Sequence, residues 1–267
     1  MMSEIIRRDE YSLLSKRIKI EGKSFPDELH EIESEQCRQL LSLQFCESVQ
    51  YIYNPLDYAQ QTHRMYLSKY CCGPKRILLL GMNPGPFGMA QNGIPFGEIS
   101  CVKNWLKISG TVGKPAHEHP QRIIQGFDCK RSEVSGKRFW EFFKDISGTP
   151  DTFFKYSFVH NYCPLSFLSK TGKNITPPQL NVSTRNDLNA ICDEALRKVV
   201  NLLNVKILIA VGKYAEERAK IALRRISEIT ICNIMHPSPI NPAANKGWNE
   251  IVKKQLQDLD VLHYFLP

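Results

Sequence analysis

The chain has 267 residues, of which 42% are hydrophobic and 23% charged, as in soluble globular proteins that can bury a sizeable core. No apolar run is long enough to span a bilayer, and charges flank the short apolar pair near the N-terminus, so we expect neither a membrane segment nor a signal peptide. The formal net charge of +8 favours a polyanionic partner, and nine cysteines without a Cys-x-x-Cys pair indicate reduced thiols.

The N-terminal third of the chain gives mixed signals. Residues 1–30 are polar with weak periodicity and predict a loosely ordered segment, followed by a single domain over residues 31–267. Apolar residues at helical spacing predict a helix at 31–45. The stretch 51–70 is rich in tyrosine and interrupted by Pro55, so that loop and short helix are both possible.

The rest of the chain alternates between strand and helix patterns. Four short apolar runs predict buried strands, at 76–80, 157–161, 205–211 and 229–235. Helical patterns follow them, at 136–146, 186–203, 214–225 and 247–259. Near-continuous apolar strands that alternate with helices indicate a parallel sheet covered on both faces. The sequence therefore predicts an α/β protein with three α/β/α layers and a central, mainly parallel four-stranded sheet.

Polar side chains follow three of these strands. The first strand runs into a Gly/Pro-rich loop with Asn83, the second ends at Asn161, and the fourth is followed by His236. Because the carboxyl ends of parallel strands share one edge, we expect two amides and an imidazole to meet in one crevice. The loop at 81–91 carries few charges, which favours a flat, neutral ligand such as a nucleobase over a phosphate. The third strand ends in Val211-Gly212-Lys213 and is predicted only to turn into its helix.

Each of these residues also has a structural interpretation. Asn83 suits a turn, His236 could cap a strand, and Asn161 could satisfy a buried backbone group. We interpret Phe87 as part of the core. His117-x-His119 with Cys129 is too irregular in spacing for zinc, so we expect no metal.

The motifs around these residues resemble the uracil-DNA glycosylase superfamily, and in particular its single-strand-selective monofunctional branch. The resemblance extends from about residue 31 to near residue 259. It is carried by the loop Gly81 to Gln91 with Gly93, Pro95, Phe96, Gly97 and Glu98, by Val134-Ser135-Gly136 with Arg138-Phe139-Trp140, by Val159-His160-Asn161 with Cys163-Pro164-Leu165, and by His236-Pro237-Ser238-Pro239 with Asn241-Pro242 and Asn245-Lys246-Gly247-Trp248.

The resemblance implies an enzyme of DNA base-excision repair that flips uracil out of DNA into a pocket and hydrolyses its bond to deoxyribose. It implies that Phe96 stacks on the base, that Asn161 binds the O4 and N3–H edge, and that the backbone near Met82 gives a further contact. It also implies that Gly85 and Met89 shape the wall beside pyrimidine C5. A glycine there leaves room for a polar substituent, so that 5-hydroxymethyluracil is a second expected substrate and thymine is rejected.

The expected chemistry follows from the two catalytic candidates. A neutral amide at Asn83 cannot remove a proton at pH 7 and can only orient a water. Such a weak nucleophile favours advanced C–N cleavage, with His236 stabilising the charge that grows on uracil O2. No lysine lies in the motif segments immediately around Asn83, Asn161 and His236, which predicts base removal without strand cleavage. No cofactor is expected, because the cysteines are not grouped as an iron–sulfur cluster requires.

The expected partner is uracil-containing DNA, single- or double-stranded. The stiff loop 237–246 would enter the space left by the flipped base, with contacts from Pro239, Ile240 and Lys246. The family generally has arginine at the position of Ile240, so activity on duplex DNA is in question. The resemblance also implies backbone contacts from 170–185, and there we expect Lys170, Lys173 and Arg185 to bind phosphates. We expect a monomer in the nucleus.

Two other functions are compatible with parts of the sequence. A binding module of the same fold could have lost catalysis, although the candidate residues are all present. A Rossmann-type nucleotide-binding enzyme would need a Gly-x-Gly-x-x-Gly or a P-loop motif, and neither occurs.

Overall fold

The computed structural model describes residues 23–267. The segment predicted to be loose lies mostly outside these residues, but its last part is helical. Helix α2 (Phe25–Leu41) begins six residues before the predicted start, with Phe25 and Leu29 buried. Its early start has a local cause, because Ser24 accepts a hydrogen bond from the backbone N–H of Asp27 and a proline occupies the first turn.

The central sheet has the predicted four strands, and all of them are parallel. They are β2 (Ile77–Gly81), β3 (Ser157–Asn161), β6 (Ile207–Val211) and β7 (Thr230–Ile234), in the order β3-β2-β6-β7. Every residue of β2 and β3 is buried, because helices cover both faces of the sheet. The predicted α/β fold with its parallel sheet is confirmed.

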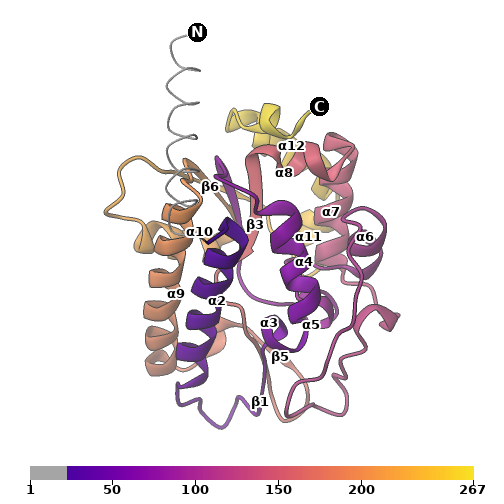
Figure 1. The fold of residues 1–267 in the computed structure, drawn as a ribbon, viewed down its shortest axis with the longest axis vertical. Helices are drawn as coiled ribbons and strands as arrows, with labels where there is room; N and C mark the ends of the chain where they lie inside the picture. Colours follow the sequence, from indigo (N-terminus) through magenta and orange to yellow (C-terminus); the bar gives the residue numbers. More distant parts are fainter. Residues whose placement is uncertain (1–22) are drawn as a thin grey trace.

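The helices form two groups beside the sheet (Figure 1). One group contains α2, α9 (Val182–Leu202) and α10 (Lys213–Ala222), in which α9 packs against both of the others. The other contains α6 (Ile99–Asn104), α7 (Val134–Ser147), α8 (Pro150–Tyr156) and α12 (Trp248–Asp258). Helix α4 (Gln60–Tyr70) packs on α2. For the stretch 51–70 the sequence left loop and short helix open, and most of it is helical. The other α-helices between residues 23 and 267 are single turns: α3 (Pro55–Tyr58), α5 (Met89–Asn92) and α11 (Pro242–Asn245).

A second, smaller sheet was not predicted. It is antiparallel, in the order β1 (Tyr51–Tyr53), β4 (Ser166–Leu168), β5 (Asn174–Ile175). Its strands have only two or three residues, too few to show an alternating pattern in the sequence. The turn between β4 and β5 carries two of the lysines expected to bind DNA.

Within residues 23–267, none of the helices combines the length and apolarity needed to traverse a bilayer.

Candidate active site

The carboxyl edge of the parallel sheet opens onto a cavity of about 720 Å³. Asn83, Asn161 and His236 all line it, and each lies at or just after the end of a different strand. The chain leaves β2 toward β3 on one side and passes from β6 to β7 on the other, so the cavity lies where the strand order reverses. Open α/β sheets bind ligands at such a point.

His236 is held as a neutral hydrogen-bond donor. The backbone N–H of Ser238 donates to His236 Nδ1 over 3.1 Å, which assigns the ring proton to Nε2. Burial lowers the pKa of His236 to about 4, so the ring is uncharged at neutral pH. The close approach of Gly212 depends on its positive φ of 95°, and a Cβ there would stand 3.1 Å from the His236 Cβ. The Nε2–H remains for a ligand.

Asn83 is oriented by a contact from another loop. Its Nδ2 donates to the backbone oxygen of Leu165 over 3.3 Å, which connects the loop after β2 to the loop after β3. The side-chain oxygen of Asn83 has no protein donor among the described residues. It can therefore accept a hydrogen bond from a water in the cavity, the one catalytic task open to a neutral amide.

Asn161 is the buried last residue of β3, opposite Gly81 of β2. Its Nδ2 donates to the sulfur of Met89 over 3.0 Å, and a thioether is a weak acceptor. A hydrogen bond from this amide to a ligand carbonyl would therefore be stronger than the contact that it replaces. A Cβ on Gly81 would overlap the Asn161 side-chain oxygen, so this position requires glycine. Beyond the strands, the N–H groups of Tyr162 and Cys163 donate to the carbonyls of Gly81 and Met82, each over 2.9 Å.

Phe96 forms an aromatic wall of the cavity. Its ring stacks on Phe139 at 4.3 Å between centroids and 8° between planes, and lies 6.3 Å from the His236 ring. The Phe96 backbone has a φ of 52°, an unusual conformation for a residue other than glycine. A Cβ on Gly136 would overlap the carbonyl oxygen of Phe96, so helix α7 is pressed against this backbone. With Phe139 on one side, the ring can stack a flat ligand only from the cavity.

Met82 and Gly85 also line the cavity. Met89 is buried and is not among the lining residues, but its sulfur contacts Asn161, which is. Our interpretation of Phe87 as part of the core was wrong. Its half-buried ring lies between two guanidinium groups, 3.8 Å from that of Arg131 and 5.3 Å from that of Arg122, as in cation–π contacts.

The six residues expected to contact DNA lie in two places. Pro239 and Ile240 line the mouth of the cavity, where Ile240 is 89% exposed, and Lys246 is exposed on the same loop. The guanidinium of Arg138 braces this loop by donating to Pro237 O over 3.1 Å and to Asn245 Oδ1 over 2.9 Å. Lys170 and Lys173 are exposed in the β4–β5 turn, and Arg185 lies in the first turn of α9.

Two charged residues in the cavity wall were missed by the sequence analysis. Lys213, with Gly212 and Tyr214, lines the cavity at the start of α10. The prediction that the third strand only turns into its helix was therefore wrong, and the shared strand edge was a signal for it. Glu133, just before α7, also lines the cavity. It follows no strand, so the reasoning from strand ends could not find it.

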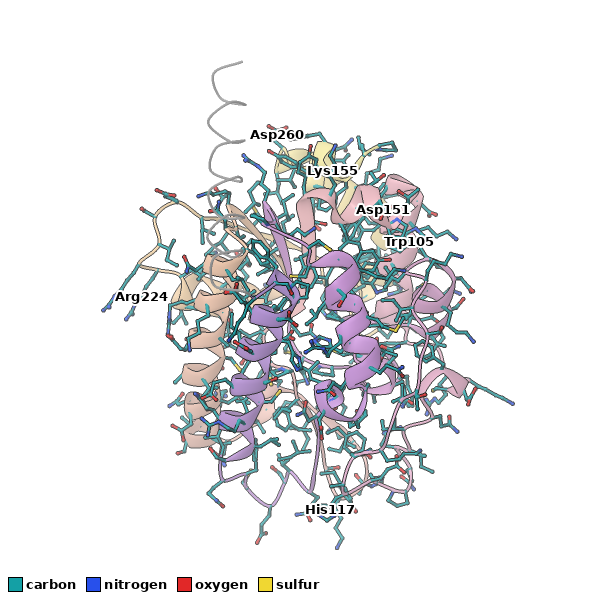
Figure 2. All side chains as sticks on the ribbon, viewed as in Figure 1. Trp105, His117, Asp151, Lys155, Arg224 and Asp260 are labelled. Atoms are coloured by element: carbon teal, nitrogen blue, oxygen red, sulfur yellow. The ribbon has the colours of Figure 1, made fainter. Side chains whose placement is uncertain are left out.

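Among residues 23–267, no group of three histidine, cysteine or acidic side chains is placed to hold a metal ion. His117 lies at the outer rim of the molecule (Figure 2). His119 is engaged elsewhere: its Nδ1 accepts from the Gln121 N–H over 3.0 Å, and its Nε2 lies 3.1 Å from Lys170 O.

Comparison with known proteins decides the family. The model of the uracil DNA glycosylase superfamily matches residues 68–260. The chain belongs to the uracil-DNA glycosylase superfamily. The resemblance to its single-strand-selective branch is also confirmed. The chain is 49% identical over 225 residues to the single-strand selective monofunctional uracil DNA glycosylase of Bos taurus, covering 84% of this chain and 83% of that protein.

Two further similarities agree with this membership. The Rattus norvegicus protein with the same description is 51% identical over 225 residues, which cover 84% of this chain and 81% of that one. The crystal structure of wild-type SMUG2 from Pedobacter heparinus has a TM-score of 0.64 at 21% identity, covering 90% of this chain and 99% of that one. At that identity, the second similarity bears on the fold alone.

Proposed function

We propose that this protein is a monofunctional DNA glycosylase of base-excision repair, which flips uracil from DNA and hydrolyses its N-glycosidic bond. One observation carries the proposal: a neutral imidazole donor and two oriented amides share one cavity with the aromatic ring of Phe96, which forms part of its wall. Family membership and the relatives described above support it.

The geometry suggests a sequence of roles. The flipped base stacks on Phe96, and Asn161 binds its O4 and N3–H edge. Cytosine reverses the donors and acceptors on that edge and is refused. His236 Nε2–H then points at O2, where negative charge accumulates as the C–N bond breaks. Asn83 holds the water that captures the resulting oxocarbenium-like sugar.

A lysine in the cavity wall could attack the sugar, which would conflict with a monofunctional reaction, so the position of Lys213 matters. The residue is exposed at the start of α10 and lines the cavity. Helix N-termini bind phosphate. We therefore assign Lys213 to the DNA backbone and not to attack on the sugar.

The decisive experiment is incubation with a uracil-containing oligonucleotide, with and without later treatment with alkali. We expect breaks only after alkali, and no covalent adduct when borohydride is added to trap a lysine imine. Asn83→Ala and His236→Leu should each slow excision by about a hundredfold or more, while Glu141→Gln, on the exposed side of α7, should not. Breaks before alkali, or a trapped adduct lost in Lys213→Ala, would contradict the monofunctional assignment.

The proposal includes 5-hydroxymethyluracil as a second substrate. Support comes from Gly85, which lines the cavity without a side chain, and from Met89 next to Asn161. The apolar methyl group of thymine gains nothing in such a space.

We also propose how the protein meets its substrate. Exposed lysines in the β4–β5 turn and on the loop 237–246 support binding to DNA, single- or double-stranded. The site residues come from one chain, which supports action as a monomer. The nucleus is proposed as the location because the substrate is DNA.

A further inference from the structure

Glu133 places a carboxyl group against the loop that follows β2. A Cβ on Gly85 or on Gly88 would overlap one of its two carboxyl oxygens, so the group lies directly on the backbone of this loop. Both glycines are needed for that contact. Glu133 precedes α7 but makes no capping hydrogen bond to the helix, and it lines the cavity.

The Glu133 carboxyl has no hydrogen bond or ion pair with any residue from 23 to 267. The neighbouring acid, Glu98, is satisfied elsewhere: it accepts from the Cys101 N–H over 2.9 Å and from the Ser132 hydroxyl over 3.0 Å. Glu133 is half-buried, and its carboxyl group lines the cavity without a protein partner, so it is available to hydrogen-bond a ligand.

The order of groups around the cavity indicates which part of the base meets Glu133. Around a uracil ring, O2, N3, O4 and C5 follow one another. His236 serves O2 and Asn161 serves N3 and O4 under the proposed function. Met89 contacts Asn161, and it belongs to the same loop as Gly85 and Gly88, on which Glu133 rests. The next ring position, C5, therefore faces this wall.

We propose that Glu133 is a specificity-determining residue that hydrogen-bonds a polar substituent on C5 of the flipped pyrimidine. This inference rests on the proposed function and names the group that distinguishes 5-hydroxymethyluracil and 5-formyluracil from thymine. A protonated carboxyl donates as well as accepts, which suits a hydroxymethyl group in either role. It also avoids a negative charge beside the departing uracil anion.

The protonation state agrees with this assignment. Burial, together with the nearby carboxylate of Glu98, raises the pKa of Glu133 to about 7. Near neutral pH a large fraction of the group is therefore uncharged.

The test compares Glu133→Leu and Glu133→Gln with the native protein on matched oligonucleotides that contain uracil or 5-hydroxymethyluracil. The measured quantity is kcat/KM on 5-hydroxymethyluracil divided by kcat/KM on uracil. In Glu133→Leu we expect this ratio to fall about tenfold while uracil excision changes by less than about threefold, because one polar contact to the substituent is lost. Glu133→Gln keeps a donor and an acceptor and should retain most of the ratio. Glu141→Leu, at an exposed position on α7, the helix that Glu133 precedes, is the matched control.

Two outcomes would overturn the inference. The ratio could stay at its native value in Glu133→Leu, or both substrates could fall by the same factor, which would mark a structural role. Thermal melting of each variant identifies the second case. Absence of uracil excision by the native protein is a different result, and it would refute the proposed function itself.

Discussion

At the scale of single residues, Asn83, Asn161 and His236 are each oriented by a hydrogen bond with a neighbour before any ligand arrives. Asn83 donates to Leu165 O and His236 accepts from the Ser238 N–H. In both cases one polar atom is used by the protein and the other remains free. Hydrogen-bond donors fixed in this way need little reorganisation when charge develops during a reaction, and this is the basis of electrostatic catalysis.

Gly81→Ala should abolish recognition with little damage to the fold. The added methyl group would overlap the Asn161 side-chain oxygen and approach the Phe96 ring to 3.1 Å, so the amide must leave its position. We expect kcat/KM on uracil to fall by about a hundredfold and stability by about 1–3 kcal/mol, as in overpacked cores. Gly110→Ala, in an exposed loop, is the control. Native activity in Gly81→Ala would show that Asn161 does not read the base.

The burial of His236 makes stability depend on pH. Its folded pKa of about 4 lies below the ordinary 6.5, so the unfolded chain binds more protons between these values. The contribution of this group is complete above pH 6.5 and declines as the pH falls to about 4. Urea unfolding of the native protein and of His236→Leu from pH 4 to pH 8 measures it. As the pH falls, the native protein should lose stability relative to His236→Leu. Parallel curves of stability against pH would contradict the burial of a neutral ring.

At the scale of elements, the loop 237–246 holds an apolar side chain in solvent at the cavity mouth. Ile240 is 89% exposed, while Arg138 on α7 holds the two ends of the loop. An exposed isoleucine on a braced loop suits insertion between bases, since apolar side chains act as wedges in other DNA-kinking proteins. It cannot make hydrogen bonds to the opposite strand.

Ile240→Arg should therefore raise activity on duplex DNA relative to single strands. A guanidinium can bond the opposite strand, and we expect the duplex-to-single-strand ratio of kcat/KM to rise by about tenfold. Ile221→Arg adds the same charge near the C-terminal end of α10, outside the cavity lining. It shows how much of the change comes from general attraction to DNA. An equal rise in both variants would remove the wedge role from Ile240.

The sequence predicted the elements with strong local patterns and missed those without them. The four apolar runs became β2, β3, β6 and β7, and their shared edge placed Asn83 near Asn161 and His236. The short strands β1, β4 and β5 hold together through pairing between distant segments, which leaves no periodic signal. Glu133 reaches the cavity through tertiary packing, for which one sequence carries no direct sign. Lys213 follows the end of β6 and could have been found by the reasoning that placed Asn83.

At the scale of the whole molecule, a buried ionic cluster connects the N-terminal helices to the central sheet. Glu33 on α2 lies 2.6 Å from His63 on α4 and 3.4 Å from His160 on β3, all three side chains being buried. His63 also bonds the backbone oxygen of Gly93 at 2.8 Å. His160 is the residue before Asn161, so the cluster also supports the strand that carries a base-recognition candidate.

Removing this charge should destabilise the protein. Desolvation would raise the pKa of Glu33, but the two histidines outweigh it and lower that pKa to about 2, while the pKa of His63 is raised by Glu33 against its own desolvation. Breaking a buried pair costs about 3–5 kcal/mol, and we expect a loss near the lower end for Glu33→Gln in urea unfolding at pH 6. Glu35→Gln, which removes an exposed pair with Arg38, should cost less than about 1 kcal/mol.

The pH window of this contribution follows from the two shifts. It should be complete between about pH 4.5 and 6.5, decline as the pH falls toward 2, and decline again as the pH rises through the raised pKa of His63. A Glu33→Gln deficit that is the same at every pH would show that the pair is not ionised.

The fully buried strands β2 and β3 also have a consequence for heat tolerance. The backbone pairing continues beyond the strands, from the N–H groups of Tyr162 and Cys163 to the carbonyls of Gly81 and Met82. The loops that carry the candidate residues are therefore attached to the part of the sheet that we expect to open last. Partial melting at the periphery should leave the enzyme working. On gradual heating, turnover should persist until the whole domain loses its structure, and should then disappear in the same narrow temperature interval.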